Sequence, residues 1–443
     1  MKQLAKFAVP LIISQLVAQL MVISDIWMMS RIGVTTMAAG GLAGSVFSFI
    51  FIVVMGLIGS VANLLAIAYG EKQHNSNNND EIRRIVKGAI LLATLISIAL
   101  LPSFYLLPSL MLMIGQPEEI ITLSMLYLHA LKWSMLPNLL ILVFRGLAIA
   151  FGSSRSVLWA SVITVILNII FSYLFAFVLD FGIVGIGYGT SFAAGLMAVC
   201  YGLWLFRQPQ FLPYKPWNKW FEYKLATIKP ILSIGIPVAL ATVTEFSLIS
   251  GAALMAGSLG VVSLAAHQIA LQILSFSWCI SYGFAQATSI FVSNQYGSNR
   301  DKQAIIRIAR HGLILATGSS ILIGLLFSIN PQLLSQGFAK PGDALFAELV
   351  EMLPGLMLVA AACFVVDAWQ LTGLSILRGM KIVLGPALLT GVGYCLVGLP
   401  AAWYLMPMFH LQGIWMGIGI GLGVTGCLLL VQVWISLNNL NSG

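Results

Sequence analysis

Three carboxylates stand inside long apolar stretches of this sequence: Asp25, Glu245 and Asp367. The other eleven acidic residues fall in predicted loops or at predicted helix ends. A bare carboxylate charge is costly within a hydrocarbon layer, so such a residue takes up a proton, binds a cation or finds an ion-pair partner. Na⁺ is a hard cation that suits carboxylate, hydroxyl and carbonyl oxygens, by analogy with Ca²⁺ and Mg²⁺. The three acids therefore predict binding and release of H⁺ or Na⁺ within a membrane.

The apolar stretch that contains Asp25 is long enough to cross a membrane as one helix. From Phe7 to Ser30 it spans roughly 36 Å at about 1.5 Å per residue, against a hydrocarbon core of about 30 Å. Asp25 therefore cannot easily leave the bilayer. Pro10 lies in the same stretch, where it removes one helical hydrogen bond, so we expect it to act as a hinge.

Polar side chains in other apolar stretches are candidates for completing the site. Asn168 and Thr190 could join Asp25, although polar packing between helices is an equal alternative. An internal ion pair with Lys132 or Arg145 is the corresponding alternative for each acid. Acidic and aromatic side chains together suit a positively charged amphipathic ligand. Our candidates for lining a substrate cavity are Gln15, Trp27, Asn63, Gln268, Gln272 and Trp369.

The elements that must position these residues are membrane helices. The chain has 443 residues, of which 59% are hydrophobic and 8% charged, and its mean hydropathy is +0.98. We therefore expect an all-α integral membrane protein in a lipid bilayer. The apolar runs predict twelve transmembrane helices, at about 7–32, 37–69, 84–107, 119–150, 156–179, 184–206, 228–258, 263–296, 305–328, 346–377, 383–406 and 412–435.

The basic residues predict how the chain is oriented. The net charge is +8, and eighteen of the twenty-two Lys and Arg residues fall in segments on the same side as the N-terminus. Only Arg31 and Lys340 fall in segments on the other side. Because positive loops stay in the cytoplasm, we expect a multi-pass protein of the cytoplasmic (inner) membrane with both termini cytoplasmic. The same pattern explains the basic charge without nucleic acid as a partner.

The two halves of the chain repeat. A shift of 227 residues carries Pro10 to Pro237 and four glycines onto glycines, among them Gly56 onto Gly283. Six helices plus six with the same orientation form a parallel repeat, which predicts two pseudo-symmetric six-helix lobes around a central cavity. The predicted domains are an N-lobe at 1–206, a cytoplasmic basic linker at 207–227 and a C-lobe at 228–443.

Three motifs make the chain similar to the multidrug and toxic compound extrusion (MATE) transporters, and nearest to their NorM-like branch. These are VISDIWMMSRIG in the first helix, LAAHQIALQI in the eighth and VVDAWQLTGLSILRGMK in the tenth. The resemblance implies an antiporter that exports small organic cations while H⁺ or Na⁺ enters. It also implies an acidic site in each half, with Asp25, Asn168 and Thr190 in one and Glu245 and Asp367 in the other. This chain departs from the pattern at Ser172, where relatives often carry a second acid, and at Cys363, where they often carry an aromatic residue.

Other classes of protein fit the sequence less well. A lipid or polysaccharide flippase is the main alternative, but its cavity should carry several cations to hold phosphate. An intramembrane enzyme should show a nucleophile or metal motif, and neither GxSxG nor HExxH is present. His129 and His267 lack metal-site spacing, so we expect no catalytic residue, metal or cofactor beyond the coupling ion. We expect the protein to work as a monomer.

Overall fold

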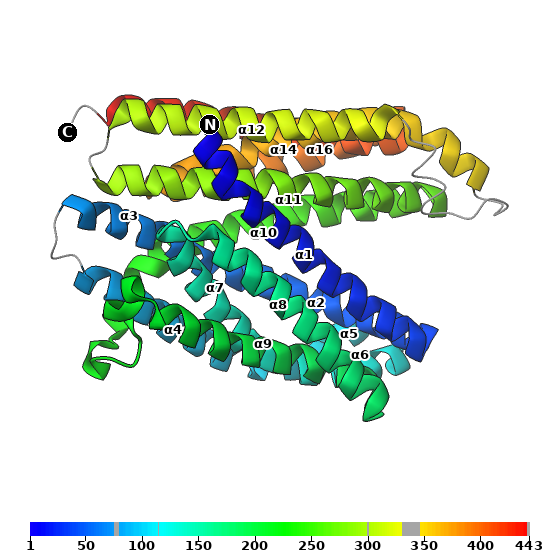
Figure 1. The fold of residues 1–443 in the computed structure, drawn as a ribbon. Coiled ribbons are helices and arrows are strands. Elements are labelled where there is room, and N and C mark those ends of the chain that lie inside the picture. Colours follow the sequence, from blue (N-terminus) through cyan, green and yellow to red (C-terminus); the bar gives the residue numbers. More distant parts are fainter. Residues whose placement is uncertain (75–78, 114, 299–300, 330–345, 441–443) are drawn as a thin grey trace. The chain divides into compact units, whose positions relative to one another are not determined.

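The computed structural model describes residues 1–74, 79–113, 115–298, 301–329 and 346–440, and no strand occurs within these ranges. Lys340 lies outside the described residues. The helices up to the linker are α1 Lys2–Ile32, α2 Val34–Gly59, α3 Val61–His74, α4 Asn79–Leu100, η1 Pro102–Tyr105, α5 Leu107–Met113, α6 Glu118–Leu131, η2 Lys132–Ser134, α7 Met135–Ala150, α8 Ser154–Tyr173, η3 Leu174–Val178 and α9 Gly182–Arg207 (Figure 1).

The linker folds into three short turns, and long helices follow it. These elements are η4 Pro209–Tyr214, η5 Trp220–Glu222, η6 Leu225–Thr227, α10 Lys229–Ser258, α11 Val261–Ser298, α12 Lys302–Ile329, α14 Phe346–Gly379, α15 Leu384–Gly391, η7 Val392–Gly398 and α16 Leu399–Asn439. The all-helical prediction is confirmed.

Eleven helical stretches in the described ranges are long and apolar enough to cross a membrane, where the sequence predicted twelve. The last stretch, Leu384–Asn439, has 56 residues and would extend about 84 Å if straight. It bends at His410, whose φ of 50° and ψ of −130° are not helical, shortly after Pro407. The bend divides the stretch into two helices of membrane length, which supplies the twelfth predicted span.

The chain forms two compact units, and the boundaries between them lie within helices rather than in loops. One unit contains Met1–Ile12 and Leu240–Gly443, and the other contains Ile13–Ala239. The divisions follow Ile12 in α1 and Ala239 in α10, and these positions are themselves 227 residues apart. Each follows a predicted repeat proline, Pro10 or Pro237, by two residues. The predicted lobes 1–206 and 228–443 thus differ from the compact units by an exchange of the first segments of α1 and α10.

Two glycine contacts repeat the same packing in both units. A Cβ atom on Gly56 would lie 2.9 Å from Ala239 Cα in one unit, and a Cβ atom on Gly283 would lie 3.1 Å from Ile12 Cα in the other. Both members of the two pairs are related by the 227-residue shift. Only glycine allows the helix backbones to approach this closely, as small residues do between membrane helices. Gly56 and Gly283 therefore mark where the exchanged segments pack.

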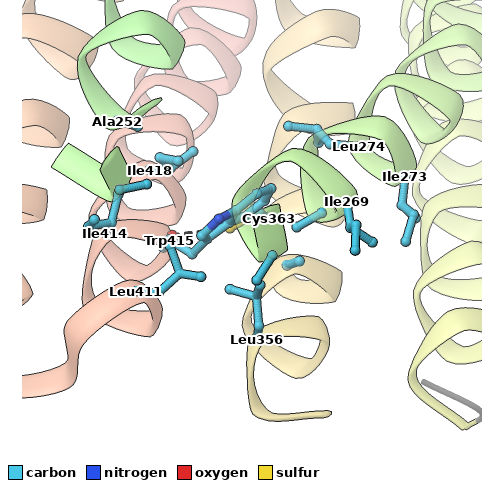
Figure 2. Close-up of a cluster of buried hydrophobic side chains, with 14 of the residues drawn as sticks. Ala252, Ile269, Ile273, Leu274, Leu356, Cys363, Leu411, Ile414, Trp415 and Ile418 are labelled. Carbon is cyan, nitrogen blue, oxygen red and sulfur yellow. Dashed lines mark hydrogen bonds between the residues drawn. The ribbon is translucent and has the colours of Figure 1, made fainter. Parts of the chain in front are cut away.

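A buried cluster holds α11, α14 and α16 together in the unit that contains Leu240–Gly443. Figure 2 shows its centre around Trp415 and Cys363. Trp415 is fully buried, and its Nε1 donates to His267 Nδ1 at 3.1 Å. Cys363 Sγ donates to the Trp415 carbonyl at 3.3 Å. His267 thus has a packing role, and Cys363 fixes α14 one turn before Asp367.

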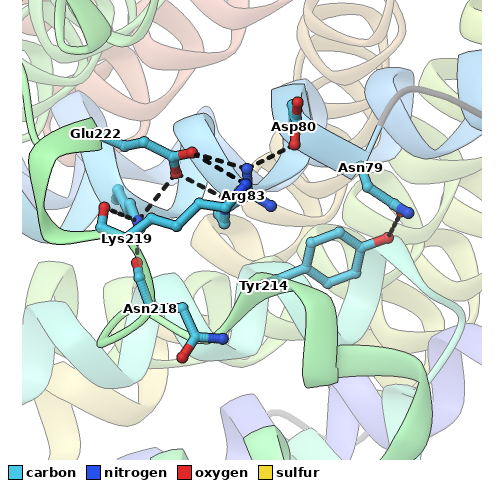
Figure 3. A network of polar contacts seen from close by, with 8 residues as sticks. Asn79, Asp80, Arg83, Tyr214, Asn218, Lys219 and Glu222 are labelled. Atoms are coloured by element: carbon cyan, nitrogen blue, oxygen red, sulfur yellow. Dashed lines mark hydrogen bonds and ion pairs between the residues drawn. The ribbon is translucent and has the colours of Figure 1, made fainter.

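The linker is held against α4 by an ion-pair network (Figure 3). Arg83 donates to both Glu222 carboxylate oxygens, at 2.7 and 2.8 Å, and to Asp80 at 2.6 Å. Lys87 is fully buried and donates to Glu222 at 3.0 Å and to the carbonyls of Asn218 and Lys219. Hydrogen bonds from Arg83 lower the pKa of Glu222 from 4.5 to about 2, and Lys87 adds to the effect. The predicted basic linker is therefore a folded segment with its own partly buried acid.

Candidate functional site

Asp25 meets Asn168 and Thr190 inside the unit that contains Ile13–Ala239. Asp25 comes from α1, Asn168 from α8 and Thr190 from α9, and all three side chains are buried. Asn168 Nδ2 donates to Thr190 Oγ1 at 2.8 Å, and Thr190 Oγ1 lies 3.4 Å from Asp25 Oδ2. The structure thus brings together the three residues that the sequence grouped.

The hydroxyl of Thr190 has two acceptors for one proton. It lies 3.1 Å from the Ile186 carbonyl in its own helix and 3.4 Å from Asp25. Asn168 already donates to this hydroxyl, so the Thr190 proton can go to only one of the two acceptors at a time. Asp25 Oδ1 and Asn168 Oδ1 are buried and have no hydrogen-bond partner among the described residues. These oxygens are the ligand type that a proton or a hard cation requires.

Two further features surround this site. Tyr127 of α6 is buried, and the charge of Asp25 acts on its phenol group. Ser172, one of the two positions at which the sequence departs from the expected pattern, donates to the Ile186 carbonyl at 3.3 Å. It does so where α8 passes so close to Gly189 that a Cβ there would meet Ser172 Cα at 2.4 Å. Position 172 therefore serves packing between helices in this chain.

The other two acids share the unit that contains Leu240–Gly443. Glu245 comes from α10 and Asp367 from α14, and their charges act on each other. Both act on Tyr394, a fully buried tyrosine of the π-helical segment η7. Within the described ranges, Asp367 Oδ2 and the Tyr394 hydroxyl have no hydrogen-bond partner. These residues form a second acidic site with unused polar atoms.

Arg378 is a cation whose charge acts on one of these acids, and sequence reasoning missed it. It lies at the end of α14, and its charge acts on Glu245. Its Nε is buried without a hydrogen-bond partner in the part of the chain that the structure describes. The sequence placed Arg378 in a loop because the predicted helix ended at residue 377. A signal was present, since eleven residues make three helical turns and put Arg378 on the same side of the helix as Asp367.

The cations that the sequence offered as ion-pair partners have other contacts. Lys132 Nζ lies 3.2 Å from His129 Nδ1 and over the rings of Tyr105 and Trp133. Arg145 donates to Ser14 at 3.4 Å. Salt bridges join Arg83 to Asp80 and Glu222, and they join Lys87 and Lys219 to Glu222. The described residues include no group of three or more His, Cys, Asp or Glu placed to hold a metal.

Among the cavity candidates of the first unit, Trp27 lies on another side of α1 than Asp25. Trp27 is exposed and stacks with Arg31 at 5.0 Å. It follows Asp25 by two residues, which is about 200° around the helix, so it points to the other side of α1. Asn63 is buried at the start of α3, and Gln15 is half-buried in α1. Their roles in substrate binding stay predictions.

Among the cavity candidates of the second unit, Trp369 contacts a neighbouring helix, and Gln268 and Gln272 are exposed. Trp369 Nε1 donates to Thr317 of α12 at 3.0 Å, and Trp369 is about 200° around α14 from Asp367. Trp369 thus joins two helices. Gln268 and Gln272 are exposed and one turn apart on α11. They share one face of that helix, and their contact with a substrate stays a prediction.

Comparison with known proteins shows which proteins this chain resembles. The family model described as MatE matches two segments, residues 10–174 and 237–404. These segments start at the repeat prolines Pro10 and Pro237, as a duplicated unit requires. A probable multidrug resistance protein NorM from Brucella suis is 29% identical over 96% of this chain and 91% of its own length. The corresponding protein from Pseudomonas putida is 30% identical over 95% and 91%.

Solved structures share the fold. An outward-facing multidrug resistance MATE family transporter of the MOP superfamily has a TM-score of 0.87 at 19% identity, and the match covers 100% of this chain and 97% of that one. The eukaryotic MATE transporter AtDTX14 has a TM-score of 0.87 at 18% identity, with 98% and 95% covered. At these identities the likeness shows the fold alone.

Proposed function

This chain belongs to the MatE family of multidrug efflux transporters, and on that premise we propose that it is a secondary antiporter that exports small organic cations in exchange for H⁺ or Na⁺. The observation that carries this proposal is the buried Asp25–Thr190–Asn168 chain with its unused oxygens. A carboxylate in a span has no water to stabilise its charge, so it favours whichever cation or proton reaches it. The same group therefore serves two competing positive ligands.

Thr190 supplies a physical link between proton uptake and the helices. When Asp25 is charged, the Thr190 hydroxyl is drawn toward it. When Asp25 is protonated, the hydroxyl donates to the Ile186 carbonyl of α9, which it already approaches at 3.1 Å. Protonation of Asp25 thus replaces a charge-assisted contact between α1 and α9 by a weaker neutral one. Pro10 lies two residues before the end of the exchanged segment of α1, where a missing hydrogen bond lets the helix bend. In our proposal this bend accompanies alternating access.

We propose that the second acidic site, in the unit that contains Leu240–Gly443, also takes part in transport. Glu245 and Asp367 are two like charges, and the charge of Arg378 acts on one of them. One acid is therefore balanced by the protein, and the other needs a proton or a cation. Two acids and one arginine can take up one positive charge from outside. We propose that this site binds the coupling ion or the exported cation, and that Tyr394 adds its hydroxyl.

The distribution of the positive residues supports a proposal for where the protein lies and how it is oriented. We propose that the protein lies in the cytoplasmic membrane with both termini in the cytoplasm, because the Lys and Arg residues concentrate on that side. We propose that it works as a monomer.

Purified protein in liposomes tests the function. Efflux of a cationic dye is measured with a pH gradient alone, with a Na⁺ gradient alone and with neither. We expect efflux above background with one of the two gradients, and the active gradient identifies the coupling ion. Equal dye movement under all three conditions would contradict antiport.

A further inference from the structure

A pocket of about 480 Å³ opens at the end of α12 that begins at Lys302. It belongs to the unit in which Met1–Ile12 packs with Leu240–Gly443. Its volume lies within the range of ordinary small-ligand pockets. It is lined by Met1, Gln303, Ile306, Arg307, Arg310, His311 and Ile314.

The charge around this pocket is positive. Arg307 and Arg310 are exposed on its wall, and the ammonium group of Met1 donates to His311 Nδ1 at 3.2 Å. None of the described residues that line it is acidic. The nearby Asp301 accepts hydrogen bonds from the backbone N–H groups of Gln303 and Ala304, so it caps α12. The two guanidinium groups remain available to an anion, and their fork geometry matches phosphate.

An apolar stripe continues from the basic residues along the same side of α12. At 100° per residue, Arg307, Ile314, Ile321 and Leu325 fall within about 40° of one another around the helix. Ile314 and Ile321 are each 46% exposed, and Leu325 is 55% exposed. Ile321 lies about 21 Å along the helix from Arg307, which exceeds the depth of one bilayer leaflet. The surface therefore has a positive end and an apolar track of acyl-chain length.

We propose that this surface is a binding site for an anionic phospholipid. The headgroup phosphate accepts hydrogen bonds from Arg307 and Arg310, and one acyl chain lies along Ile314 and Ile321. Basic pockets at the membrane boundary hold anionic lipid headgroups by this combination of charge and apolar contact. A soluble anion would use only the basic end, and a zwitterionic lipid would bring its own positive charge to it.

Native mass spectrometry of the purified full chain in neutral detergent tests this site. The protein is titrated with phosphatidylglycerol and, separately, with phosphatidylcholine. A basic residue near a membrane surface changes the affinity for anionic lipid by about fivefold. We expect Arg307→Gln to weaken phosphatidylglycerol binding about fivefold and Arg307→Gln/Arg310→Gln about thirtyfold, while phosphatidylcholine binding stays unchanged.

A matched control variant removes two positive charges from helix ends outside the pocket. Arg84 and Arg207 are exposed at other helix ends, so Arg84→Gln/Arg207→Gln should bind phosphatidylglycerol within threefold of the parent. Equal binding by the Arg307→Gln/Arg310→Gln variant and the parent would overturn the proposal. A third arm adds inorganic phosphate and the variant Ile314→Asn/Ile321→Asn. Displacement of the lipid by millimolar phosphate, with no effect of that variant, would show a free-anion site and would also overturn it.

Discussion

The ion-pair network between the linker and α4 gives a prediction that can be worked out in numbers. We consider Glu222→Gln, which keeps the shape of the side chain and removes its charge. The variant leaves Lys87 fully buried and Arg83 mostly buried, each without its main counter-charge. Removal of one partner from a buried ion pair costs about 3–5 kcal/mol. Lys87 keeps two carbonyl acceptors and Glu222 is 18% exposed, so we expect a smaller loss of about 2 kcal/mol.

Limited proteolysis measures this loss locally. Trypsin can cut the linker after Lys219 or Lys224 only when the segment opens. If opening is fast relative to cleavage, the rate follows the population of the open form. A loss of about 2 kcal/mol therefore accelerates cleavage about thirtyfold. Cleavage of Glu222→Gln within threefold of the parent rate would refute the proposed role of the network.

Two further variants make the test specific. Glu81→Gln removes an exposed acid from the same helix and should leave linker cleavage near the parent rate. The double variant Lys87→Met/Glu222→Gln removes the buried cation together with the acid. It should be cut more slowly than Glu222→Gln alone, because the fully buried Lys87 charge is gone and Arg83 still has Asp80 as a partner.

Three shorter predictions follow from the described contacts. Gly56→Ala should cost about 1–3 kcal/mol and lower the melting temperature in detergent, because the new Cβ meets Ala239, whereas Gly41→Ala in the same helix meets nothing described and should cause no loss. The pKa of Glu222 lies at about 2 in the folded protein and at 4.5 when unpaired, so its contribution is complete above about pH 4.5 and is lost as pH falls toward 2. Hydrogen exchange of the linker should therefore show constant protection from pH 8 to 5 and weaker protection at pH 3. Arg378→Gln should lower dye efflux at least fivefold at equal protein abundance, with partial recovery in Arg378→Lys, because Glu245 loses its balancing charge; unchanged efflux would remove Arg378 from the site.

The site residues were predictable where their chemistry conflicts with their surroundings. Asp25 and Asp367 stand out because a carboxylate in an apolar run is costly, and that signal needs no knowledge of the fold. Arg378 was not predicted because helix ends are uncertain by a few residues, and its loop assignment depended on one helix ending at 377 instead of 379.

The helices and their repeat could be predicted from the sequence. Contacts between residues that are distant in sequence could not. The pairing of Lys87 with Glu222 joins residues 135 apart and has no periodic pattern to reveal it. The exchange of Met1–Ile12 and residues 228–239 between units is likewise a matter of packing. The sequence contained one indication of this exchange, the spacing of Pro10 and Pro237. That spacing revealed the repeat but did not show where the units divide.

The most direct test of the proposed function is the efflux rate of Asp25→Asn in liposomes, at a protein content matched to the parent. The amide is nearly the same size as the acid and cannot release a proton or hold a cationic charge. Asp180→Asn is the control, because Asp180 is exposed and its φ of 58° suits asparagine. We predict that Asp25→Asn loses at least nine-tenths of gradient-driven efflux while Asp180→Asn keeps the parent rate. Efflux by Asp25→Asn at near the parent rate would contradict a coupling role for the Asp25 site.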